Sequence, residues 1–146
     1  MSRIPRIQEH LKTGFTSEAV SAAKFRAYAH RARRDGLPNL AEHWEALAAA
    51  KDELARIQLE HAGKIRGGAT DIGAELAEER YENEVLYPKL IRSAGSDEVV
   101  GVFQEVIEAQ EDHLRRLDAL RRALGSAEGD VEAPREAEAR EPVPAG

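Results

Sequence analysis

The chain contains no cysteine, and this absence removes several kinds of chemistry at once. Disulfide bonds, thiolate zinc sites, iron–sulfur centres and cysteine nucleophiles all require that residue. Long apolar runs are missing too, so no segment is expected to span a bilayer. The first fifteen residues lack the apolar centre of a secretory signal. We therefore expect a cytoplasmic protein that has no membrane partner.

Aromatic residues are scarce, at 5 % of the chain, and alternating β-branched stretches are missing. The residues that dominate are alanine, leucine, glutamate and arginine, all of which favour helices. Hydrophobic residues make up 42 % of the 146 residues, which is enough for one domain with a core. The composition therefore predicts an all-α fold.

The formal net charge of −6 is divided unevenly along the chain. Residues 126–146 hold six acids and two arginines, so this segment carries −4 and the remainder about −2. The arginine clusters at 31–34 and 115–122 fall near the expected C-terminal ends of helices, where cations complement the helix dipole. We expect no nucleic-acid partner.

Apolar residues recur at steps of three and four over residues 17–34, 38–62, 70–90 and 97–124. Thr16 or Ser17, Thr70 and Ser96 are the expected N-caps, and Pro38 opens the second helix. Short joins near residues 36 and 95 make each consecutive pair antiparallel. The pattern predicts an antiparallel four-helix bundle over residues 1–125, and residues 1–14 are compatible with a short preceding helix. Residues 126–146 are expected to be a disordered acidic tail.

Several polar residues fall on helix faces that the bundle would bury. Glu79 and Glu82 are three residues apart and share one side of their helix. Counting from the turn near Gly95 places Gln110 and His113 at the same depth. In the other hairpin, Glu18 falls beside Lys51 and Leu54.

These segments resemble the rubrerythrins, diiron members of the ferritin-like superfamily. The resemblance rests on FTSEAVSAAKF, DGLPNLAEHWEALAAA, ERYENEVLYP and FQEVIEAQEDH, which occur in the family's order over about residues 8–124. It implies a ferritin-like bundle in which carboxylates and histidines hold two iron ions. The residues that match the family's metal ligands are Glu18, Glu79, Glu82 and His113.

Three expected ligand positions differ from the family pattern. Lys51 and Leu54 stand where the resemblance implies a Glu-x-x-His pair, and Gln110 stands where it implies a glutamate. An ammonium group repels a metal and can neutralise the remaining acids. We therefore expect Glu18, Glu79 and Glu82 to gather around Lys51, with at most one weakly bound metal.

Two repairs of the site are possible but less favoured. Gln58 and His61 repeat the spacing of Gln110 and His113, yet His61 lies about 10 Å beyond the level of Glu18. A shift of the helix to use Glu53 would also bring in Arg56.

Three functions remain open from the sequence. The preferred one is a rubrerythrin-like protein with a partial site, metal-free or holding a single iron or other divalent ion, and with little or no oxidase activity. The second is a diiron peroxidase or ferroxidase, which would need an external electron donor because the chain has no cysteine. The third is a metal-independent helical interaction module. A homodimer is expected.

Overall fold

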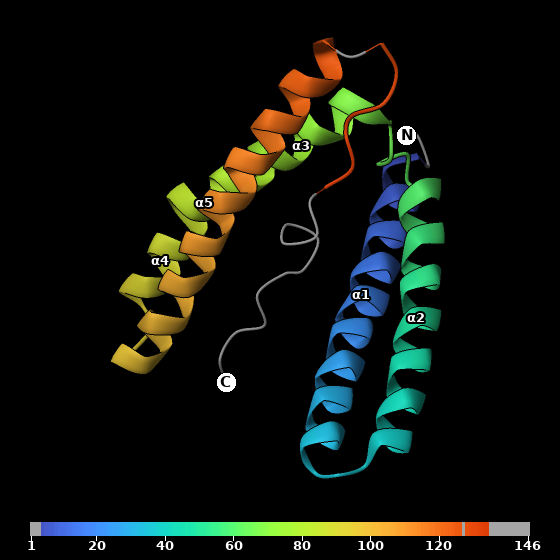
Figure 1. The fold of residues 1–146 in the computed structure, drawn as a ribbon, viewed down its shortest axis with the longest axis vertical. Coiled ribbons are helices and arrows are strands. Elements are labelled where there is room, and N and C mark those ends of the chain that lie inside the picture. Colours follow the sequence, from blue (N-terminus) through green and yellow to red (C-terminus); the bar gives the residue numbers. More distant parts are fainter. Residues whose placement is uncertain (1–3, 127, 135–146) are drawn as a thin grey trace. The chain divides into compact units, whose positions relative to one another are not determined.

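The computed structural model describes residues 4–126 and 128–134. The chain divides into two compact units, residues 1–66 and 67–146. Within the described residues all regular structure is helical, which confirms the all-α fold class (Figure 1). In this part of the chain, no helix is both long enough and apolar enough to cross a membrane.

The first unit is a helical hairpin, named hairpin 1, made of α1 (Ile4–Arg34) and α2 (Pro38–His61). The two helices lie side by side and run in opposite directions (Figure 1). The predicted second helix is confirmed, including its start at Pro38. The predicted N-cap at Thr16 or Ser17 is wrong, because α1 continues through both residues and the Thr16 hydroxyl donates to the Lys12 carbonyl. Residues 4–14 are therefore part of α1 and form no separate helix.

Small residues hold α1 and α2 together. The side chains of the seam are buried or half-buried and alternate at steps of three and four, at 15, 18, 22, 25, 29 and 32 on α1 and at 41, 44, 48, 51, 55 and 58 on α2. This is the spacing of a coiled coil. Every seventh residue of α2 from Ala41 is a buried alanine, and Ala62, directly after the helix, continues the series; these alanines let the two backbones approach closely.

The two sides of hairpin 1 differ in chemistry. Residues that directly follow seam positions form ion pairs between the helices, Arg26 with Asp52 and Arg33 with Glu45. Residues that directly precede seam positions lie on the opposite side. Four of them, each directly before a buried alanine of the seam, are apolar and exposed, and we call them the apolar face of hairpin 1: Tyr28, Leu40, Leu47 and Leu54.

The second unit, hairpin 2, contains α3 (Gly68–Tyr81), the π-helical turn η1 (Glu82–Leu86), α4 (Tyr87–Arg92) and α5 (Asp97–Ser126). The predicted N-cap at Ser96 is confirmed, because its hydroxyl accepts the Val99 amide at 3.2 Å. The cap predicted at Thr70 is wrong. The helix begins at Gly68, and the Asp71 carboxylate accepts the Gly67 amide at 2.8 Å.

The predicted third helix is interrupted by the π-helical turn. The Tyr87 amide donates to the Glu82 carbonyl, five residues earlier, where an α-helix would use four. Pro88 follows directly and has no amide hydrogen, so the ordinary ladder cannot continue through it. Asn83 lies in this turn and donates from Nδ2 to the Ile107 carbonyl of α5 at 3.0 Å. The turn begins at Glu82, one of the two predicted site glutamates, and Glu79 lies three residues before it at the end of α3.

The described chain after α5 is short. The helix ends at Ser126, one residue past the predicted boundary of the domain, and residues 128–134 are not helical. Residues 127 and 135–146 lie outside the described residues, and most of the predicted disordered tail, 126–146, falls there.

Candidate functional site

In hairpin 1, the structure pairs two of the predicted site residues. Glu18 and Lys51 occupy facing seam positions, and Lys51 Nζ lies 2.8 Å from Glu18 Oε2. The side chains are 21 % and 33 % exposed, so the pair is largely withdrawn from water. Leu47 and Leu54 stand one turn before and one turn after Lys51, which places the charges in the middle of the apolar face. A plain surface role does not explain an ion pair in this position.

In hairpin 2, the other predicted residues form two polar contacts. His113 Nδ1 lies 3.2 Å from Glu79 Oε1, and the Gln110 amide donates to Glu82 Oε2 at 2.9 Å. The Glu79 side chain is only 12 % exposed, and Glu82 is half-buried. Neither glutamate points into bulk solvent, although the acidic sequence around them is typical of a solvated surface.

Hairpin 2 has a shortage of hydrogen-bond donors at this point. Glu79 Oε2, Gln110 Oε1 and Asn83 Oδ1 are buried and have no hydrogen-bond partner. Each of these atoms is an acceptor, so an added donor or cation would satisfy them. The three atoms mark an incomplete polar site.

Crowded acids change the proton affinity of this region. Burial, and then repulsion by Glu78 and Glu79, raises the pKa of Glu82 above its ordinary value. Burial also raises the pKa of Glu75, and Glu78, Glu79 and Glu82 add to the effect. Both carboxyl groups therefore hold their protons more tightly than a glutamate in water, first because of burial and then because of the neighbouring acids.

A pocket of about 270 Å³ lies beside the Glu79–His113 contact. Its lining combines polar and apolar side chains: Glu75, Glu79, His113, Arg116, Leu117 and Leu120. Sequence reasoning missed Glu75, Asn83 and Arg116. A usable signal existed for Glu75, which precedes Glu79 by one helical turn and so shares its side of α3.

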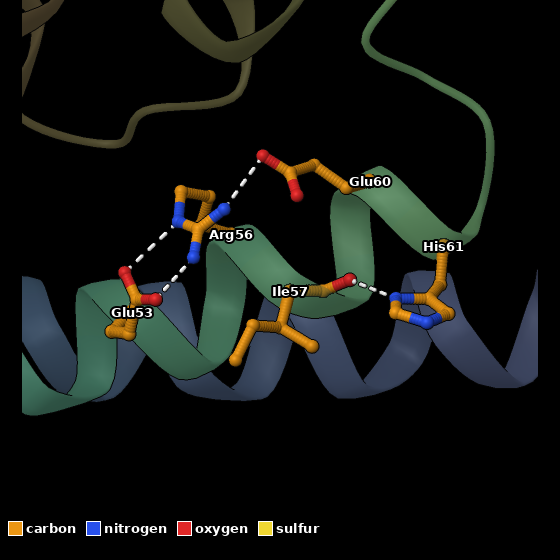
Figure 2. Close-up of polar contacts among 5 residues, drawn as sticks. All are labelled: Glu53, Arg56, Ile57, Glu60 and His61. Atoms are coloured by element: carbon orange, nitrogen blue, oxygen red, sulfur yellow. Dashed lines mark hydrogen bonds and ion pairs between the residues drawn. The ribbon is translucent and has the colours of Figure 1, made fainter.

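The alternative α2 ligands considered from the sequence, Gln58 with His61 or Glu53, do not lie together as metal ligands. His61 Nδ1 is within hydrogen-bond distance of the Ile57 carbonyl, at 2.9 Å, in its own helix (Figure 2). Gln58 donates to the Leu54 carbonyl at 3.2 Å. Glu53 and Glu60 both bind Arg56 on an exposed side of α2 (Figure 2). These are contacts between neighbouring turns of one helix.

The donor set does not fit a dinuclear metal centre. Within each hairpin taken by itself, no group of three histidines or acids among the described residues is placed to hold a metal ion. Lys51 and Leu54 offer no metal-binding oxygen, and Gln110 offers a neutral amide oxygen in place of a carboxylate. The atoms that remain free for one cation are in hairpin 2, where Glu79 Oε2 and Gln110 Oε1 have no partner.

The predicted gathering of Glu18, Glu79 and Glu82 around Lys51 stays a prediction beyond the Glu18–Lys51 pair itself. Comparisons of the chain with protein-family models, with curated proteins and with solved structures found no match. The resemblance to the rubrerythrins therefore stands on the motifs alone.

Proposed function

We propose that the chain is a rubrerythrin-like protein whose hairpins pack as an antiparallel four-helix bundle around a partial metal site, one that holds a single ion or none. Each hairpin supports this by carrying its polar pair near mid-length, Lys51 ten residues before the end of α2 and Glu79 eleven after the start of α3. The exposed apolar side chains beside both pairs would be buried by such packing.

The ion pair between Lys51 and Glu18 is the observation that carries the proposal. Lys51 stands where the family resemblance implies a carboxylate ligand, and its ammonium group already bonds Glu18. A carboxylate withdrawn from water needs a counter-charge, which either a metal ion or an ammonium group can supply. In the proposed site, the Lys51 ammonium group supplies this positive charge, so Glu18 does not need one of the two metal ions that the resemblance implies.

The metal content of the protein tests this directly. Protein purified without a His-tag should contain clearly fewer than two metal ions per chain and show negligible peroxide turnover with an external electron donor. The triple variant Lys51→Glu, Leu54→His and Gln110→Glu should gain a second ion, because it restores the missing ligand types. As a matched control, Ala46→Glu with Ala49→His places the same Glu-x-x-His spacing on an outward side of α2 and should leave the metal content unchanged. Two tightly bound ions in the unmodified protein would instead favour the diiron oxidoreductase.

The stability of the metal-free protein provides a second test. Lys51→Ala should lower the free energy of unfolding by about 1–2 kcal/mol, because Glu18 loses its counter-charge. The loss should be smaller than for a fully buried pair, since Lys51 is one-third exposed. Added divalent metal should recover part of it by binding only the folded state. Lys24→Ala, at an exposed position of α1, is the control and should have little effect.

A further inference from the structure

The apolar stripes of the two hairpins lie on particular helices. In hairpin 1, the exposed leucines Leu40, Leu47 and Leu54 belong to α2 and are 45–50 % exposed. In hairpin 2, half-buried residues recur every seven positions along α5 at 100, 107 and 114; the residues directly before them are Val99, Val106 and His113, and Leu120 follows at the same spacing, so the set is mainly apolar. The equivalent residues on the other arm of hairpin 2 are Glu75 of α3 and Glu82 of η1, which directly precede the buried Leu76 and the half-buried Asn83. By chemistry, the leucines of α2 therefore match α5 and do not match α3.

The chain between the hairpins restricts which helices can meet within one molecule. Only the six residues 62–67 lie between the end of α2 and the start of α3. Fully extended, they span at most about 25 Å. In both hairpins, the side available for packing is the one formed by residues that directly precede seam positions. If these two sides meet with the end of α2 and the start of α3 at the same end of the bundle, α2 lies against α3. Counting from the linker, Leu54 then falls level with Glu75 and Leu47 with Glu82, which would bury leucines against crowded carboxylates.

Reversing the direction of hairpin 2 relative to hairpin 1 brings the apolar face of hairpin 1 against the apolar side of α5. With α2 antiparallel to α5 and Lys51 level with His113, Leu47 falls level with Leu117, between His113 and Leu120, and Leu40 falls level with Leu124. Leu54 falls level with Gln110, between Val106 and His113. In this arrangement α3 runs parallel to α2, so it must start at the far end of α2. That helix has 24 residues and is about 36 Å long. The six-residue linker is too short to make this connection.

We propose that hairpin 1 packs against hairpin 2 of a second copy of this chain. The result is a dimer of two bundles, and each site combines residues of both chains: Glu18 and Lys51 from one, and Glu79, Glu82, Gln110 and His113 from the other. The inference rests on the four-helix bundle of the proposed function. It adds that the two hairpins of each bundle come from different chains. The shortage of donors around Glu79 in hairpin 2 agrees with packing against a cationic residue such as Lys51; it supports the bundle, and the linker length and the apolar match decide which chain supplies that residue.

Cross-linking of cysteine variants tests which chain supplies each half, because the natural chain has no cysteine to interfere. The single variants Leu47→Cys and Leu120→Cys are mixed, unfolded, refolded together and treated with a short bis-maleimide. Exchange between chains predicts covalent dimers in the mixture and almost none in either variant alone. The control is the double variant Leu54→Cys with Glu75→Cys, which cross-links within a monomer only if α2 lies against α3.

A longer linker provides an independent test. About 20 Gly/Ser residues inserted between Gly63 and Lys64 would allow one chain to span the length of α2. The insertion should convert the dimer into a monomer of unchanged helix content, as measured by light scattering and circular dichroism. A matched surface pair completes the set. Leu47→Glu should raise the dimer dissociation constant at least about tenfold, whereas the adjacent outward substitution Ala46→Glu should not change it.

The outcomes separate this inference from the proposed function. Dimers with cross-links between residues 47 and 120 of different chains support both. A monomer with cross-links between 54 and 75 would overturn the exchange of hairpins while keeping a four-helix bundle. A chain that gives neither cross-link would overturn the bundle itself, and the exchange with it.

Discussion

At the scale of single residues, the proposed character of the site depends on Lys51, which stands where the resemblance implies a glutamate ligand. Lys51 differs from the implied glutamate in charge and in the direction of its effect, since it attracts the acids that a metal would otherwise bridge. Its pairing with Glu18 was predicted from sequence because both the substitution and the depth count were visible there. The contact of Asn83 with the Ile107 carbonyl was not predicted, because it depends on the π-helical turn.

The raised pKa values of Glu75 and Glu82 predict how stability depends on pH. A carboxyl whose pKa is higher in the folded state binds its proton more tightly there than in the unfolded chain. Each group therefore lowers the free energy of unfolding as the pH rises from about 4.5 through its folded pKa, and the penalty is complete above it.

Glu75→Gln should remove its part of this penalty. The variant should gain stability relative to the natural chain at pH 7, and the difference should shrink as the pH falls through the folded pKa of Glu75 and be lost below about 4.5. Urea unfolding across pH 4–7 measures it. Glu84→Gln, at an exposed position in the same acidic run, serves as control. A Glu75 variant that loses stability at pH 7 would show that the carboxylate has a favourable partner.

At the scale of secondary structure elements, the sequence predicted helix identity better than helix boundaries. Pro38 and Ser96 mark true starts because each satisfies a local rule of the first helical turn. Thr16 was misread because a threonine inside a helix can bond to the carbonyl four residues earlier, as it does here with Lys12. The π-helical turn had one visible sign, Pro88, but a proline alone does not say which carbonyl the preceding amide will use.

The cap at Ser96 gives a prediction at this scale. Ser96→Ala removes the acceptor for the Val99 amide at the start of α5 and should cost about 1 kcal/mol of unfolding free energy. Urea denaturation provides the measurement. Ser93→Ala is a close control, because its hydroxyl donates only a long 3.4 Å hydrogen bond to the Lys89 carbonyl. Equal losses in the two variants would mean that the cap contributes nothing specific.

At the scale of the whole molecule, the pattern of the sequence shows which faces are apolar but not which molecule covers them. The alanines of the α1–α2 seam specify a hairpin because their contacts are local and leave little choice of partner. Leu40, Leu47 and Leu54 specify only that something apolar must meet them. The length of the linker supplies the missing information, and it becomes usable only once the ends of α2 and α3 are known.

The acidic tail provides the last prediction. Residues 126–146 are rich in Glu, Ala, Pro and Gly and carry a net charge of −4, so they offer little apolar surface to a folded core. Truncation after Ser126, where α5 ends, should shift the melting temperature by no more than about 2 °C. Differential scanning calorimetry of the full and shortened chains at one protein concentration measures the shift. The concentration must be matched because the proposed dimerisation would also change the melting temperature. A fall well beyond that range would mean that the tail docks on the helices, and a further truncation series would then locate the segment responsible.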